Sequence, residues 1–316
     1  MSKFFKRGIH NKKFLYEIEN GSLKPLVELV NSNEDLVLQI RDDYFNVYYQ
    51  GGNVAKVTSS KSVDFDENYF RTHIEKSKEN WEEIKKKRQT TMALFKKGLF
   101  SDYIDTVKSA MKYYWDNVLE GKGVAEKMAQ HQICILNTNQ TEYTVIDLEY
   151  QVSTESIFKY RGKRKTKSGG LPSPRFDIVA IRNSDHRLCV IELKKGTKAL
   201  KDPSGVQEHA ESFVHTIGFD KKTKNAFLSE MNDVLQMKKK LKLIDEIVFI
   251  DTTLEPEFLY AYQNNPNEQD YKKGIILDFE MQKRYFRYYQ EYKKKDNFAK
   301  GKKVIWLDEN CYLLKD

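Results

Sequence analysis

The spacing of apolar and polar residues predicts a small α+β unit at the start of the chain. The runs at residues 35–41, 44–50 and 53–58 have the composition of strands, and the last two meet across Gly51 and Gly52 as a hairpin. A further strand is predicted at residues 14–19 and a short helix at residues 22–30. Residues 1–75 are therefore expected to form an N-terminal unit, whose role the pattern does not indicate.

Helix-forming and charged residues dominate the next part of the chain, and residues 76–119 are predicted to be a helical connector. The second domain, residues 120–316, begins with a helix that leads up to residue 136. A strand at residues 142–152 and two paired strands within residues 174–196 follow. Helices at about 204–217 and 235–241 and a strand at 246–251 complete the set. The expected fold class is α/β, of the α+β mixed-sheet kind, with core elements in the order αβββαβ.

Composition adds a bias toward a polyanionic partner. The 316 residues are 40% hydrophobic and carry a net charge of +8, which suits nucleic acid but also many ordinary basic proteins. There is no apolar run of signal-peptide or membrane length and no phosphate-binding GxxxxGK[ST] motif, so a soluble cytoplasmic protein without ATP-driven chemistry is expected. The three cysteines lie far apart and are interpreted as small core residues: Cys134, Cys189 and Cys311.

Charged residues interrupt the two paired strands within residues 174–196. Side chains alternate across a strand, so Glu192 and Lys194 share one face. A hairpin centred between Ser184 and Asp185 places Asp177 directly opposite Glu192. Opposed residues have Cβ atoms about 4.5–5.5 Å apart, where two like charges repel. A divalent cation would relieve that repulsion, whereas an ion-pair ladder between Asp177 and Lys194 on a half-exposed hairpin is the plainer alternative.

Two carboxylates on adjacent strands provide the oxygen ligands that Mg²⁺ prefers. A lysine two residues from one of them can orient or deprotonate the attacking water, and can stabilise charge on a phosphate. The pattern of Asp177 on one strand and Glu192, Leu193, Lys194 on the next resembles the PD-(D/E)XK nuclease superfamily, although Phe176 replaces the usual proline before the aspartate.

The resemblance implies a restriction-endonuclease-like core and a Mg²⁺- or Mn²⁺-dependent nuclease that hydrolyses phosphodiester bonds, expected to be those of DNA. Asp177 and Glu192 would bind the metal, and Lys194 would orient or help deprotonate the attacking water or stabilise the charge of the transition state. The resemblance also implies one further metal-linked acid, for which Glu126 on the first core helix and Asp147 or Glu149 on the first core strand are candidates. Each of these acids is equally well explained as a solvated surface residue.

Gln207 is a further catalytic candidate, because one nuclease branch resembling the bacterial recombination exonucleases uses a glutamine near this point. The alternative is a helix capping box, since Ser204 stands three residues before Gln207. His209 and His215, six residues apart, fit neither a helical zinc pair nor a catalytic triad, and are interpreted as ordinary surface or partly buried histidines.

A basic loop at residues 159–170 lies between the first and second predicted core strands. It is expected either to contact nucleic acid or to be merely solvated, and its candidate contact residues are Arg161, Lys163, Arg164, Lys165 and Lys167. The tyrosine-rich run at residues 285–295 could stack on bases, but its helical spacing favours core packing.

Two other kinds of function compete with the nuclease hypothesis. A catalytically silent module could keep the fold and only bind nucleic acid, or the chain could be a protein-interaction domain in which the basic charge is incidental. The sequence leaves open the form of the nucleic acid, whether ends or internal sites are cut, and whether the chain forms a homo-oligomer.

Overall fold

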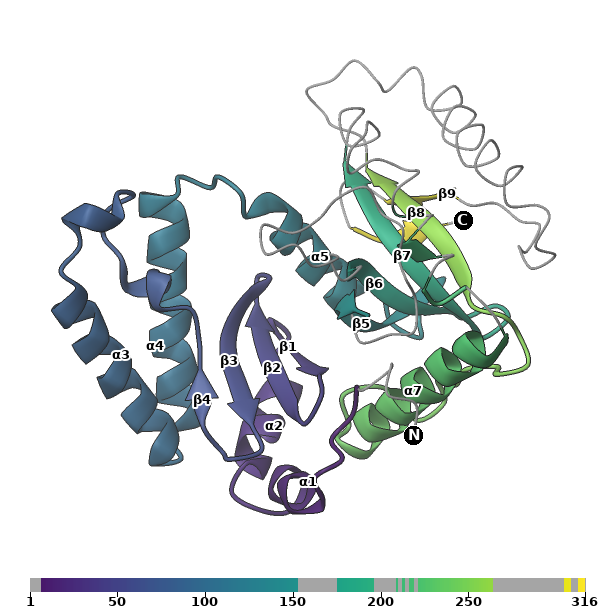
Figure 1. Cartoon of the computed structure of the whole chain (residues 1–316), viewed down its shortest axis with the longest axis horizontal. Coiled ribbons are helices and arrows are strands. Elements are labelled where there is room, and N and C mark those ends of the chain that lie inside the picture. The colour runs from purple at the N-terminus through teal and green to yellow at the C-terminus, as the bar shows by residue number, and fades with distance from the viewer. Residues whose placement is uncertain are drawn as a thin grey trace. The chain divides into compact units, whose positions relative to one another are not determined.

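The chain folds into two compact units, each built around its own sheet (Figure 1). The computed structural model describes residues 7–152, 175–195, 209, 212–213, 216–218, 221–263, 304–307 and 312–315. Residues 7–135 and 236–244 form one unit, called here the N-terminal unit, and the C-terminal unit comprises residues 136–235 and 245–316. The stretch predicted as a helical connector is thus part of the N-terminal unit. The fold is mixed α+β, as expected.

Two short helices open the N-terminal unit, α1 (Lys12–Glu19) and α2 (Lys24–Asn31). The strand predicted at residues 14–19 is therefore wrong. The side chain of Asn11 accepts hydrogen bonds from the backbone N–H groups of Lys13 and Phe14, which caps a helix. Phe14 and Ile18, four residues apart, are both buried on one side of that helix. A short apolar run is compatible with both the helical repeat of about 3.6 residues and the strand repeat of two, and here the Asn11 cap makes the segment helical.

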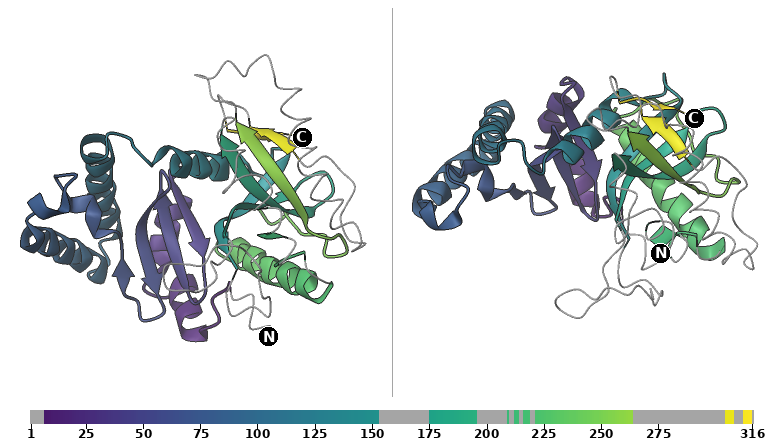
Figure 2. Two further views of the ribbon diagram at one scale, coloured as in Figure 1. Left: turned by 45° about the horizontal axis from the view of Figure 1, so that its top comes forward. Right: turned by 90° about the horizontal axis from the view of Figure 1, so that it is seen from above.

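The predicted strands that follow are all present, as β1 (Leu36–Ile40), β2 (Tyr44–Tyr49) and β3 (Gly52–Thr58), and β4 (Val63–Asp64) extends the antiparallel sheet in the order β1-β2-β3-β4. The hairpin across Gly51 is confirmed, with Tyr49 opposite Gly52. Helices α1 and α2 lie against this sheet (Figure 2), and Phe14 stacks on Phe45 of β2 with ring centroids 6.0 Å apart.

Helices make up the rest of the N-terminal unit. They are η1 (Glu67–Phe70), η2 (Lys76–Lys78), α3 (Trp81–Lys96), α4 (Phe100–Tyr113), a π-helical turn η3 (Tyr114–Val118) and α5 (Ala125–Leu136), of which the last residue belongs to the C-terminal unit. Helix α4 packs on the sheet through Tyr103, whose hydroxyl donates a hydrogen bond of 2.9 Å to the carbonyl of Val54. Helix α5 approaches the β2–β3 turn so closely that a Cβ at Gly51 would collide with the carbonyl of Lys127.

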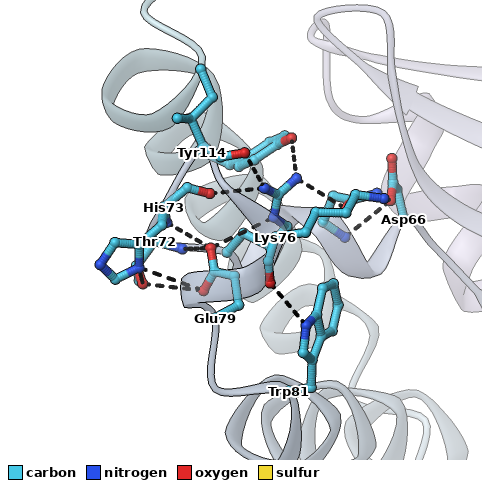
Figure 3. A network of polar contacts seen from close by, with 10 residues as sticks. Asp66, Thr72, His73, Lys76, Glu79, Trp81 and Tyr114 are labelled. Carbon is cyan, nitrogen blue, oxygen red and sulfur yellow. Dashed lines mark hydrogen bonds and ion pairs between the residues drawn. The ribbon is translucent and has the colours of Figure 1, made fainter.

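A buried polar network fixes the loop between η1 and α3 (Figure 3). The carboxylate of Glu79 accepts hydrogen bonds from the backbone N–H groups of Thr72 (2.9 Å) and His73 (2.6 Å). Arg71 donates to the carbonyls of His73 (2.9 Å) and Ile74 (2.6 Å). Burial alone would raise the pKa of Glu79, but the bonds from His73 and Thr72 outweigh it, and the pKa lies below its ordinary value.

The C-terminal unit contains a mixed six-stranded sheet in the order β10-β9-β8-β7-β6-β5. The strands are β5 (Tyr143–Gln151), β6 (Arg175–Arg182), β7 (Arg187–Lys195), β8 (Glu257–Gln263), β9 (Val304–Leu307) and β10 (Leu314–Lys315). Strands β5, β6 and β7 form an antiparallel meander, whereas β8 is parallel to β7 and to β9 (Figure 1).

The strand predicted at residues 246–251 is wrong, because the fourth strand of the core is β8. Val248 and Ile250 are buried while Ile247 and Phe249 are exposed, which reproduces the alternation of a strand without its pairing. The segment forms a turn on Asp245, whose side chain accepts the N–H of Ile247. An alternating pattern shows only that one side of a segment is buried. To be a β-strand, the segment must also pair with a neighbouring strand.

One long helix, α7 (Lys221–Lys240), covers part of this sheet. Its first part buries a stripe at helical spacing that includes Phe227, Met231 and Val234. The ring of Phe227 packs edge-on against Tyr150 of β5 at 5.2 Å, and the Tyr150 hydroxyl donates a 2.6 Å hydrogen bond to Glu230. Among the described residues, no helix is both long and apolar enough to cross a bilayer.

Candidate active site

The β6–β7 hairpin brings Asp177 and Glu192 to the same level of the sheet. Its pairing runs from Arg182 opposite Arg187 to Ile178 opposite Ile191. This is the register predicted from a turn centred between Ser184 and Asp185. Asp177 and Glu192 each lie one residue beyond this last regular pair, on neighbouring strands.

The side chain of Asp177 takes part in the strand pairing. Its Oδ2 accepts a 2.8 Å hydrogen bond from the backbone N–H of Leu193, the residue that follows Glu192. Asp177 is half-buried, and the regular pairing ends just before it, at Ile178. A carboxylate bonded to the neighbouring strand in this way is held at a fixed place beside Glu192.

Glu192 and Lys194 are buried together in the sheet, with 3% and 5% of their surfaces exposed. They lie two residues apart on β7 and therefore share a face, as expected. Lys194 Nζ lies 3.0 Å from Glu192 Oε1. The other carboxylate oxygen, Oε2, is buried and has no hydrogen-bond partner in the part of the chain that the structure describes. Such an oxygen is costly to bury unless something binds it.

His209 is a site residue that the sequence analysis missed. Its Nδ1 lies 2.9 Å from Glu192 Oε1, the same oxygen that Lys194 contacts. His209 and Phe213 are helical, and the Phe213 ring stacks on Phe258 of β8 at 5.2 Å. The available signal was the spacing of His209 and Phe213, which puts both on one side of a helix that follows the strand carrying Glu192.

The donors around Glu192 keep its carboxylate ionised. Burial alone raises the pKa of Glu192, but the hydrogen bond from His209 and the charge of Lys194 outweigh burial, so the pKa lies below its usual range. The site therefore holds a desolvated negative charge on a sheet strand, with both of its donors on one oxygen.

A β-bulge changes the expected arrangement of the acids on β5. Val145 lies opposite Ala180 and Asp147 opposite Val179, so Val145 and Asp147 do not share a face, although unbroken alternation along a strand would place them on one. The bulge at Ile146 turns Asp147 to the face that carries Val179. Asp147 is fully buried, and its Oδ1 accepts the N–H of Leu148 at 2.9 Å.

Glu149 stands opposite Asp177 in the β5–β6 register, between the pairs formed by Leu148 and Tyr150. Its backbone has a left-handed φ of 49°. Its carboxylate lies 3.5 Å from Arg175, and its side chain is 31% exposed. Glu149 is thus near Asp177 in the order of the strand pairs, and its carboxylate is paired to an arginine.

The remaining predicted site residues lie either in the other unit or outside the described residues. Glu126 is exposed on α5 within the N-terminal unit. Gln207 and the basic loop lie outside the described residues, and so do the loop's candidate contact residues Arg161, Lys163, Arg164, Lys165 and Lys167.

The candidate ligands are of the chemical type that a divalent metal such as Mg²⁺ prefers. Asp177 and Glu192 are hard oxygen donors, and the unsatisfied Oε2 of Glu192 is a place for one ligand bond. Among the described residues, no three histidine, cysteine, aspartate or glutamate side chains are arranged as a complete metal site. Mg²⁺ characteristically takes one or two carboxylates and completes its shell with waters and phosphate, so two protein carboxylates are compatible with it.

Comparison of the chain with protein-family models, with curated proteins and with solved structures found no match.

Proposed function

We propose that the chain is a metal-dependent nuclease of the PD-(D/E)XK type, in which Asp177 and Glu192 bind Mg²⁺ or Mn²⁺ and Lys194 acts on the water or the phosphate. The observation that carries the proposal is the buried Oε2 of Glu192, which has no hydrogen-bond partner among the described residues, next to Leu193, whose backbone N–H is bonded to Asp177. The restriction-endonuclease-like order αβββαβ belongs to this proposal. It is supported by the succession α5, β5, β6, β7, α7 and β8.

A bound divalent metal would polarise a phosphate oxygen and lower the pKa of a coordinated water. Asp177, held by its bond to Leu193, keeps one carboxylate in place beside Glu192. Lys194 lies in contact with Glu192 at 3.0 Å, and its ammonium group can orient the attacking water or stabilise the negative charge that develops on the phosphate. Placing these groups on two paired strands limits their movement relative to one another.

The net charge of +8 supports nucleic acid as the substrate, with DNA as the first expectation. The basic loop at residues 159–170 connects β5 to β6, the strand that carries Asp177. Contacts from this loop would neutralise phosphate charges of the nucleic acid, and the loop directly precedes the strand that carries Asp177 in the sequence.

The test is incubation of the purified protein with linear, circular and single-stranded DNA and with RNA, with Mg²⁺, with Mn²⁺ and with a chelator. Asp177→Asn and Glu192→Gln are the test variants, since each removes a charge at nearly constant shape. Asp185→Asn is the matched control, because Asp185 is an acid at the turn of the same hairpin and pairs with Arg182 and Arg187. Metal-dependent cleavage by the wild type and the control, but by neither test variant, would support the proposal.

A second candidate is a catalytically silent module that binds nucleic acid without cutting it. It is favoured by the contacts of Lys194 and His209 on Glu192, which resemble a structural ion pair, and by the lack of a three-residue metal site in the described part of the chain. Salt-dependent binding of nucleic acid without cleavage under any metal condition would support this candidate instead.

A further inference from the structure

The two oxygens of the Glu192 carboxylate have different surroundings. Oε1 receives both Lys194 Nζ, at 3.0 Å, and His209 Nδ1, at 2.9 Å. Oε2 is buried and has no hydrogen-bond partner among the described residues. Two donors on one oxygen fix the rotation of the carboxylate, and this leaves the other oxygen for a ligand.

The element that carries His209 is anchored on the same face of the sheet. Phe213, four residues after His209 in the sequence, is buried and stacks on Phe258 at 5.2 Å. Phe258 pairs with Val190, two residues before Glu192 on β7.

The chemistry of the contact fixes which atom holds the proton. A carboxylate offers only lone pairs to an imidazole, so Nδ1 of His209 must donate. An ammonium and an imidazole are not equivalent here, because Lys194 has a long flexible stem, whereas the His209 ring has only two rotatable bonds. When Lys194 turns to a water or phosphate, His209 still holds Oε1.

We propose that His209 is a positioning residue that fixes Glu192 through Oε1 and thereby presents Oε2 to the metal. The inference rests on the proposed function, since it assumes that Glu192 is a metal ligand. It assigns separate tasks to the two donors: His209 holds the ligand, and Lys194 is left for the reaction. Groups that orient a metal ligand in this way typically change metal affinity by about 10–100-fold when removed.

The test is direct binding of Mn²⁺ to the full chain, measured by calorimetry without substrate, for the wild type and three variants. His209→Ala removes the donor. His209→Asn places an amide N–H on the atom that corresponds to Nδ1, whereas His209→Gln places it one bond further from the backbone. Circular dichroism checks that each variant is folded, and the Asn and Gln variants differ by only one methylene group.

The expected result is Mn²⁺ affinity about 10–100-fold weaker for His209→Ala, as for loss of a group that orients a ligand, with most of the affinity retained by His209→Asn and less by His209→Gln. Equal affinity in the wild type and His209→Ala would overturn the positioning role, and so would equal losses in the Ala and Asn variants. Failure of the proposed function looks different: the wild type itself would bind no Mn²⁺, or Asp177→Asn and Glu192→Gln would bind it as tightly as the wild type.

Discussion

The carboxylate of Asp177 accepts a hydrogen bond of 2.8 Å from the backbone N–H of Leu193, and so joins β6 to β7 at the point where regular pairing stops. Leu193 lies between Glu192 and Lys194, so this one bond fixes the position of Asp177 relative to both. The residue proposed as a metal ligand is therefore also part of the hairpin's structure.

Asp177 variants should separate these two roles. Asp177→Asn keeps an acceptor for the Leu193 N–H and should unfold close to the wild-type temperature, although it loses the charge needed for metal. Asp177→Leu removes the acceptor and should cost about 1–3 kcal/mol, the usual effect of leaving a buried donor unsatisfied. Thermal unfolding of both variants without metal measures this difference. Equal stability of the two would show that the bond does not contribute.

The buried Glu79 network should make the stability of its loop depend on pH. The folded-state pKa of Glu79 lies below the ordinary 4.5, so the unfolded chain binds the proton more readily. The stabilisation is then complete above about 4.5 and is lost as the pH falls through the folded-state pKa. Hydrogen exchange at Thr72 and His73 should show less protection in Glu79→Gln than in the wild type at pH 7, with the difference shrinking in acid. A difference that did not depend on pH would contradict this account.

Glycine at position 51 is expected to be essential for the N-terminal unit. Its φ of +82° disfavours a side chain, and a Cβ would collide with the backbone carbonyl of Lys127. Gly98 provides the matched control, since its φ of +76° is similar but nothing lies within 4 Å of its Cβ position. Gly98→Ala should lower the free energy of unfolding by about 1 kcal/mol, because a side chain is disfavoured at this positive φ. Gly51→Ala should cost about 1–3 kcal/mol more, because packed backbone must move. Similar unfolding temperatures for the two variants would be inconsistent with the close approach of α5.

The basic loop should contribute to nucleic-acid affinity through phosphate contacts. Replacing Lys163, Arg164 and Lys165 by glutamine should weaken binding and lower the magnitude of the slope of log affinity against log salt. The expected change is about 2 to 3 for three lost contacts to a duplex. Fluorescence anisotropy over a salt series measures it. An unchanged slope would favour a loop that is merely solvated, and the same replacement of three exposed lysines outside the loop, Lys86, Lys96 and Lys97, controls for loss of charge alone.

The parts of the fold that the sequence predicted are those set by local pattern. The β6–β7 register follows from a short turn between two apolar runs, and it holds from Arg182 opposite Arg187 to Ile178 opposite Ile191. The segment at residues 14–19 is short enough to fit both the helical and the strand repeat, and the Asn11 cap makes it a helix. The alternation at residues 246–251 reflects burial on one side without strand pairing. The fourth core strand is instead β8, at Glu257–Gln263.

The candidate site was predicted only as far as its β-hairpin. The bulge that turns Asp147 to the face of Val179 has no signature in the alternation of residues 143–151, which is continuous in the sequence. His209 reaches Glu192 through the packing of Phe213 on β8, a contact between residues far apart in sequence. Contacts of this kind depend on tertiary structure, which a pattern along one segment does not contain.

The central claim is that Asp177 and Glu192 together support metal-dependent hydrolysis of a nucleic acid. The most direct measurement is the initial rate of strand cleavage against Mg²⁺ concentration for the wild type, Asp177→Asn, Glu192→Gln and the control Asp185→Asn. We expect Mg²⁺-dependent cleavage by the wild type and the control, and a loss of about 10³-fold or more in the two site variants, equivalent to several kcal/mol of transition-state stabilisation. Cleavage that persists in both site variants, or no cleavage of DNA or RNA by the wild type with either Mg²⁺ or Mn²⁺, would contradict it.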